Sequence, residues 1–246
     1  MFTCIPKWDF IKKIKWDTCN NGNIFKKLNL HNVGVDMNRL YHLRLSYNNL
    51  QIDLVDPKTN IPTRCRRYSN FNIDVSNPNK FIFTDNKITL FKQDVDDFRK
   101  ETRTFLPLEY HIMDDDFKDL LTQMSALALY STNFNKNIKK MNMAVHQVRL
   151  ITYPNIVADN APEGIHRDGV DTIVSALVMN KHNIQKAESI LYDENLNTLL
   201  NTKLNVGEFI FQEDRHLWHD ITPIESSSTK KNIGYRDILG FDFIYN

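Results

Sequence analysis

The chain has 246 residues, with 31 Lys and Arg, 30 Asp and Glu, and a formal net charge of +1. A chain of this length forms one large domain or at most two small ones, and it can fold without disulfides or a structural metal. The balanced charge argues against a basic nucleic-acid-binding surface and against an acidic disordered tail.

The cysteines and the hydropathy pattern indicate a soluble protein of a reducing compartment. Cys4, Cys19 and Cys65 are sparse, odd in number and without C-x-x-C spacing. No run of about 18 apolar residues is present that would span a membrane. Residues 1–16 lack the continuous apolar segment and the cleavage site of a signal peptide. We therefore predict a cytoplasmic protein that binds neither nucleic acid nor membranes.

The first 140 residues are predicted to form a mixed, helix-rich support. Residues 92–101 have a helical and mostly solvated pattern. The clearest helix runs from Asp116 to about Lys139, because its apolar residues recur at helical spacing, and Asp114 and Asp115 before it are candidate caps. Turn signals between residues 50 and 75 flank a basic and aromatic run from Arg64 to Phe71.

After Lys140 the pattern changes to short apolar or β-branched runs separated by turn-like segments. The predicted strands are Val145–Tyr153, Thr172–Met179, Ser189–Tyr192, Glu208–Gln212, Leu217–Thr222 and Ile238–Tyr245. Several short strands in one region favour an antiparallel sandwich or barrel. We predict a single α+β domain over residues 1–246, in which an N-terminal helical layer (1–140) covers a jelly-roll-like core (141–246).

Two potential metal ligands lie close together at His166 and Asp168. Side chains two residues apart on a strand share one face, so this imidazole and this carboxylate would point to the same side, with Arg167 turned away. Gly169 follows the pair directly and suits a bend, because glycine tolerates backbone conformations that other residues avoid.

Two histidines downstream compete as the third ligand. His219 shares its strand face with the apolar residues Leu217 and Ile221, whereas His216 lies on the opposite face. An inward-facing ligand with apolar neighbours favours His219. Two histidines and one carboxylate on one side of a metal form the facial arrangement of non-haem Fe(II) oxygenases, which leaves open coordination positions.

A lone arginine at the start of the last apolar strand adds a fourth element. Burying the Arg236 guanidinium without an anion is costly, and its planar fork matches a carboxylate in a bidentate manner. The distal carboxylate of 2-oxoglutarate is such a partner. The alternative is an ordinary ion pair, with Asp237 or Asp242.

Each of these elements alone has a structural explanation. An H-x-D tripeptide is common by chance, a single histidine such as His219 often has a purely structural role, and a single arginine is often half of an ion pair. Their combination, in this order and in a β-rich region, favours the functional interpretation. The sequence then predicts a catalytic metal site of His166, Asp168 and His219, with Fe(II), 2-oxoglutarate and O2 as its partners.

Several segments also resemble a known family. Pro162 to Gly169 reads PEGIHRDG, which resembles the PEG-x-H-x-DG signature of 2-oxoglutarate/Fe(II) dioxygenases of the bacterial L-isoleucine 4-hydroxylase type. Further similar segments are Arg66–Phe71, Arg103–Leu108, His146–Arg149, His219–Ile224 and Arg236–Leu239. The resemblance implies a double-stranded β-helix, Fe(II) ligands at His166, Asp168 and His219, 2-oxoglutarate on Arg236, and hydroxylation of a free L-amino acid.

The resemblance leaves the substrate open. Where the family reads N-I-x-G-G-E-S, this chain has Lys186 and Ala187 in place of the two glycines. A free amino acid needs a cation and an anion beside it, for which we propose Arg149 and Glu163 as binding residues; ordinary ion-pair roles are the alternative. Three other functions remain: hydroxylation of peptide or protein side chains, a non-catalytic metal-binding jelly-roll module, and a zinc hydrolase using the same ligands.

Overall fold

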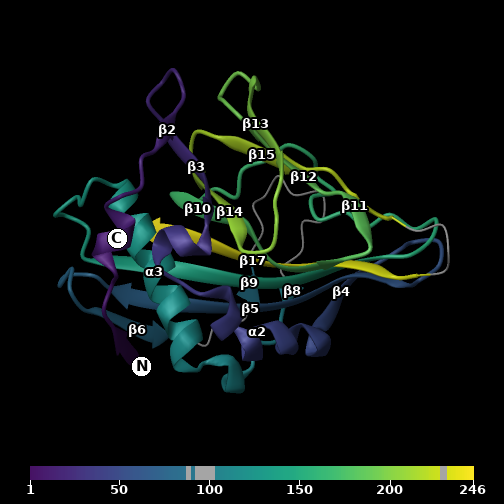
Figure 1. The fold of residues 1–246 in the computed structure, drawn as a ribbon, viewed down its shortest axis with the longest axis horizontal. Helices are drawn as coiled ribbons and strands as arrows, with labels where there is room; N and C mark the ends of the chain where they lie inside the picture. The colour runs from purple at the N-terminus through teal and green to yellow at the C-terminus, as the bar shows by residue number, and fades with distance from the viewer. Residues whose placement is uncertain (87–89, 92–102, 228–231) are drawn as a thin grey trace.

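A computed structural model describes residues 1–86, 90–91, 103–227 and 232–246. Within these residues, ten strands form one antiparallel sheet that runs through the molecule (Figure 1). In sheet order the strands are β1 (Phe2–Cys4), β6 (Phe81–Asp85), β5 (Pro62–Asp74), β9 (Lys140–Thr152), β17 (Gly234–Tyr245), β10 (Thr172–His182), β14 (Glu208–Glu213), β3 (Ile24–Asn29) and β2 (Asp17–Thr18), with β4 (Gln51–Val55) paired to the first half of β5.

The remaining strands of the described residues form three smaller sheets. They are β13 (Thr198–Lys203), β12 (Glu188–Tyr192) and β15 (Trp218–Ile221); β11 (Ile184–Lys186) with β16 (Ile224–Ser226); and β7 (Leu90–Phe91) with β8 (Arg103–Thr104). The helices are α1 (Trp8–Ile11), α2 (Tyr41–Ser46) and α3 (Asp115–Ser131), with short 3-10 turns η1 (Leu30–Val33), η2 (Met37–Arg39), η3 (Tyr47–Asn49) and η4 (Tyr110–Ile112).

The long strands β9 and β17 separate an apolar core from a cavity. On β9, Met143 and Val145 point to the core that includes α3, whereas His146 and Val148 point to the cavity. On β17, the core residues Leu239, Phe241 and Phe243 alternate with the cavity residues Ile238, Gly240 and Asp242. This alternation follows from the period of two of a strand. The cavity also contacts β12 and β15, so it lies between the main sheet and the smaller one.

The expected N-terminal helical layer is not confirmed. Much of the first 140 residues is β structure, and β5, β6 and β1 extend the same sheet that carries β9 and β17 (Figure 1). The basic and aromatic run from Arg64 to Phe71, to which the sequence pattern assigned no element, lies in the 13-residue strand β5. The helix predicted over residues 92–101 lies outside the described residues. No helix in the described part of the chain is long and apolar enough to cross a membrane.

The predicted long helix is present but shorter than expected. Asp114 caps α3, since its side chain accepts a hydrogen bond from the Phe117 N–H at 2.8 Å. The helix ends at Ser131 rather than near Lys139, because Asn133 and Phe134 adopt left-handed backbone conformations with φ of 53° and 55°. The chain then turns into β9, so that α3 packs on the face of the sheet opposite the cavity.

Candidate metal centre

The segment of the H-x-D motif is a loop between β9 and β10 rather than a regular strand. It pairs with β15 through an isolated antiparallel bridge, in which the His166 N–H donates to the His219 carbonyl at 3.0 Å and the His219 N–H donates to the His166 carbonyl at 2.9 Å. Gly169 has a φ of 79°, a conformation that glycine adopts without strain. This local bridge places the loop and β15 side by side.

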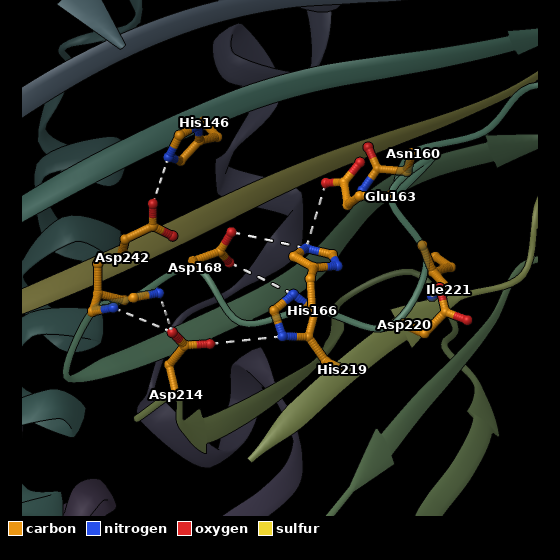
Figure 2. Close-up of polar contacts among 12 residues, drawn as sticks. His146, Asn160, Glu163, His166, Asp168, Asp214, His219, Asp220, Ile221 and Asp242 are labelled. Carbon is orange, nitrogen blue, oxygen red and sulfur yellow. Dashed lines mark hydrogen bonds and ion pairs between the residues drawn. The ribbon is translucent and has the colours of Figure 1, made fainter. Parts of the chain in front are cut away.

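The structure brings His166, Asp168 and His219 together (Figure 2). One potential ligand atom from each lies within 4.8 Å of the others. The Asp168 carboxylate lies between the two rings, with Oδ1 3.9 Å from His166 Nε2 and Oδ2 3.6 Å from His219 Nε2. Two imidazoles and one carboxylate are the donor set that suits Fe(II) in non-haem oxygenases. The residues present therefore fit this metal.

The protonation of the two rings also suits metal binding through Nε2. His166 Nδ1 lies 2.7 Å from the Gly164 carbonyl oxygen, to which it donates when the other nitrogen is free to bind a metal. Burial lowers the pKa of His219 to about 4, against the opposing effect of the Asp168 charge. At neutral pH His219 is therefore uncharged, as a metal ligand must be. His216, the rival candidate, instead pairs with Glu194 at 2.8 Å on an exposed surface.

Arg236 is buried at the start of β17 and is 1% exposed. Its two terminal nitrogens have no hydrogen-bond partner among the residues that the structure describes. By strand alternation it shares the inner face with Ile238 and Gly240, although it lies beyond the residues that line the cavity. Burial lowers the pKa of the guanidinium to about 10, so it stays charged at neutral pH. A buried cation without a partner fits a bound carboxylate.

Of the two residues proposed for substrate binding, only Glu163 reaches the cavity. It lines the cavity, with Oε1 3.7 Å from His166 Nε2. Arg149 lies on the opposite face of β9, where its Nε and Nη2 donate to Asp237 at 2.6 and 2.8 Å. Its guanidinium also stacks on the Tyr235 ring at 4.6 Å. The structure therefore does not bring Arg149 into the site, because the strand alternation points it outward.

The cavity contains further polar residues. Arg66 and His146 lie in segments that resemble the known family, and Arg66 was a further candidate for substrate binding, whereas Arg64 was not a candidate for the site from the sequence. Arg64 and Arg66 enter it from β5, and Arg64 binds the buried Asp53 at 2.6 Å. His146 enters from β9 and lies 2.7 Å from Asp242 of β17. In the sequence, the alternation of Arg64, Arg66 and Tyr68 was the available signal for β5. The pairing of His146 with Asp242 spans 96 residues, so no local pattern shows it.

The cavity beside the three ligands has a volume of about 130 Å³. A cavity of this size suits a small molecule. Its wall carries carboxylates, arginines and histidines as well as apolar side chains such as Val148, Ile173 and Ile210. A concave site with apolar walls and a few polar groups, here between two β-sheets, is suited to small-molecule binding.

Comparison with known families identifies the family to which the chain belongs. Residues 44–242 match the family described as 2OG-Fe dioxygenase, and the chain belongs to this family. Its members depend on Fe(II), 2-oxoglutarate and O2, and this chain is an Fe(II)- and 2-oxoglutarate-dependent oxygenase. The mostly antiparallel β architecture is consistent with the jelly-roll of such enzymes.

Solved structures show the same fold at low sequence identity. IDO from Bacillus thuringiensis is 17% identical with a TM-score of 0.71, covering 90% of this chain and 94% of that one. A bsmA homolog from Methylobium petroleophilum is 19% identical with a TM-score of 0.72, covering 89% and 88%. The Fe(II)/(alpha)ketoglutarate-dependent dioxygenase TqaL is 18% identical with a TM-score of 0.64, covering 89% and 82%. A comparison with curated proteins gave no match.

Proposed function

We propose that this oxygenase hydroxylates an unactivated C–H bond of a free L-amino acid or a close derivative. The observation that carries the proposal is the small cavity beside His166, Asp168 and His219, whose wall presents charged groups of both signs. A free amino acid carries both charges in a small volume, so it can satisfy such a wall. The resemblance of the segment from Pro162 to Gly169 to the L-isoleucine 4-hydroxylase type supports the same substrate class.

The residues of the site have separate roles. His166, Asp168 and His219 hold Fe(II), and Arg236 binds the distal carboxylate of 2-oxoglutarate through its free guanidinium nitrogens. When bound, Fe(II), 2-oxoglutarate and O2 supply the oxidation: one oxygen atom enters the substrate as hydroxyl, the other enters succinate, and CO2 leaves. The protein orients the substrate and excludes water from the cavity.

The polar wall offers partners for the charges of an amino acid. Glu163 lies beside His166 and suits the ammonium group, as the sequence suggested. Arg66 replaces Arg149 as the candidate for the carboxylate, since it lines the cavity and Arg149 does not. Arg66 also lies over the Phe105 ring, with its guanidinium carbon 5.5 Å from the ring centroid. This aromatic contact stabilises the cation, and the Arg66 Nε also lies 3.8 Å from the Asp53 carboxylate.

A screen of the twenty amino acids tests the proposal. Each is incubated with the enzyme, Fe(II), 2-oxoglutarate and ascorbate, and both succinate and the hydroxylated product are measured. We expect one amino acid or a small group to raise succinate above the uncoupled background, with equal amounts of product. If only peptides or proteins stimulate turnover, the enzyme is a side-chain hydroxylase of macromolecules. If nothing does and 2-oxoglutarate is never consumed, the chain is a metal-binding module.

A further inference from the structure

The two histidines of the metal centre differ in the group that lies within reach of Nδ1, the nitrogen that does not bind the metal. A histidine that binds a metal through Nε2 carries a proton on Nδ1, which needs an acceptor that fixes the ring. For His166 this acceptor is the Gly164 carbonyl at 2.7 Å. Near His219 Nδ1 lie two side chains, Gln212 with Nε2 at 3.4 Å and Asp214 with Oδ1 at 3.7 Å.

Asp214 is fully buried in the turn after β14, and its carboxylate faces both segments of the metal centre (Figure 2). Oδ2 accepts hydrogen bonds from the Gly169 N–H at 2.8 Å and the Val170 N–H at 3.2 Å, immediately after Asp168. Oδ1 has no hydrogen-bond partner among the described residues. A buried carboxylate oxygen without a donor is costly, and the nearby His219 N–H is a donor that would satisfy it.

Gln212 is less suited to be this acceptor. Its amide nitrogen faces both His219 Nδ1 and the Leu217 carbonyl, each at 3.4 Å. An amide nitrogen cannot accept a proton from Nδ1. Turning the amide over would present its oxygen to His219, but the nitrogen would then lose the Leu217 carbonyl. The carboxylate of Asp214 accepts the hydrogen bond without that loss and adds a charge-assisted contact.

We propose that Asp214 is a positioning residue that couples the two segments of the metal centre. Its Oδ1 accepts a hydrogen bond from the His219 Nδ1–H and so directs Nε2 toward the metal. Its Oδ2 accepts a hydrogen bond from the backbone N–H of Gly169, which follows Asp168. A single carboxylate thereby fixes a ligand from each side of the site. This inference rests on the proposed metal-binding role of His219 and Asp168.

Metal binding by the purified, metal-free protein tests the inference without turnover. Co(II) is titrated into wild type, Asp214→Ala, Asp214→Asn and Gln212→Leu, and its visible absorption is followed. We expect Asp214→Ala to weaken the Kd by about 10- to 100-fold, which is the usual effect of losing such a partner. Asp214→Asn should lie between it and wild type, because one amide oxygen cannot serve both segments. Gln212→Leu should bind Co(II) nearly as wild type does.

A matched control separates positioning from mere support of the loop. Asp171 lies on the loop that carries Asp168 and pairs with Arg215, and its side chain makes no hydrogen bond or ion pair with His219 among the described residues. Asp171→Asn should lower the melting temperature of the metal-free protein while leaving the Co(II) Kd close to wild type. In the Zn(II)-loaded protein, Asp214→Asn should shift the His219 Nδ1 proton resonance and leave that of His166 in place.

The possible failures are distinguishable. Wild-type Co(II) affinity in Asp214→Ala, or in Asp214→Asn if the alanine variant does not fold, overturns the role of Asp214. A large loss confined to Gln212→Leu assigns the role to Gln212 and equally overturns it. If wild type itself binds no Co(II), or if His219→Ala binds it unchanged, the proposed metal site fails instead.

Discussion

Two arginines lie on opposite faces of the main sheet, Arg236 buried on β17 and Arg149 half-buried on the neighbouring β9, and their surroundings differ. On the outer face, Arg149 of β9 makes a bidentate pair with Asp237 and stacks on Tyr235. On the inner face, Arg236 has no partner for either terminal nitrogen within the described residues. Both side chains come from long central strands, and both look alike in the sequence.

The pKa shifts of Arg149 and Arg236 differ in the same way as their surroundings. Burial alone would lower the pKa of Arg149, but hydrogen bonds and charge from Asp237 raise it overall. Burial lowers the pKa of Arg236, and no anion opposes the shift. The outer pair is therefore complete within the protein, whereas the two terminal nitrogens of the inner guanidinium have no hydrogen-bond partner among the described residues. A burial pattern alone does not separate a structural arginine from a binding one, because the decisive feature is whether its hydrogen bonds are already used.

The largest effect is expected from the metal ligands on the inner side. His166→Ala, Asp168→Ala and His219→Ala should each reduce turnover below detection, because each removes one of the three groups that hold Fe(II). Succinate release and melting curves measure activity and folding side by side. His216→Ala is the matched control and should stay active, since His216 pairs with exposed Glu194. Loss of activity in His216→Ala with retention in His219→Ala would reverse the ligand assignment.

Next in size is the effect of removing the inner arginine. Arg236→Ala should raise the KM for 2-oxoglutarate far more than that for the amino acid. Losing one partner of a buried charged pair costs about 2–5 kcal/mol, or roughly one and a half to three and a half orders of magnitude in affinity. Arg236→Lys should recover only part of this, because an ammonium lacks the planar fork. An unchanged KM together with a lower melting temperature would make Arg236 purely structural.

Removing Arg149 from its pair with Asp237 should instead lower stability and leave 2-oxoglutarate binding unchanged. Arg149→Ala leaves the carboxylate of Asp237 buried without its main partner, which costs about 3–5 kcal/mol of unfolding free energy. The KM for 2-oxoglutarate should stay close to wild type. Denaturant unfolding and the same KM titration check both statements. A double variant with leucine at both positions should recover much of the loss, because no uncompensated charge remains; a large KM change in Arg149→Ala would place it in the site.

The same contrast explains what the sequence could predict. The H-x-D pair was identified from its spacing, although its segment is a loop and not the expected strand, and the choice of His219 over His216 came from strand alternation; both are local patterns. The pairing of Arg149 with Asp237 depends on two strands 88 residues apart, so the sequence left both arginines as binding candidates. Strand β5 was missed because its inward face carries Arg64 and Arg66, and buried charges there interrupt the apolar alternation that identifies strands.

The smallest expected effects come from the end of β11, where exposed Lys186 and the buried Ala187 that follows it both have a left-handed backbone. Lys186 and Ala187 replace the two glycines of the family pattern and have φ values of 64° and 60°. Ala187 packs with Val148 and Ile238 on the inner side, whereas Lys186 is exposed and pairs with Glu225. The left-handed backbone costs a residue with a side chain of order 1 kcal/mol relative to glycine.

Glycine substitution should therefore act differently at these two neighbours. Lys186→Gly should be more stable than Lys186→Ala by about 1 kcal/mol, since both lose the exposed ion pair and only glycine relieves the backbone. For a chain of this size that difference raises the melting temperature by roughly 2–4 °C. Ala187→Gly should change stability little, because losing a buried methyl costs about 0.8 kcal/mol and offsets the relief. A Lys186→Gly variant that melts below Lys186→Ala would show that the backbone there carries no strain.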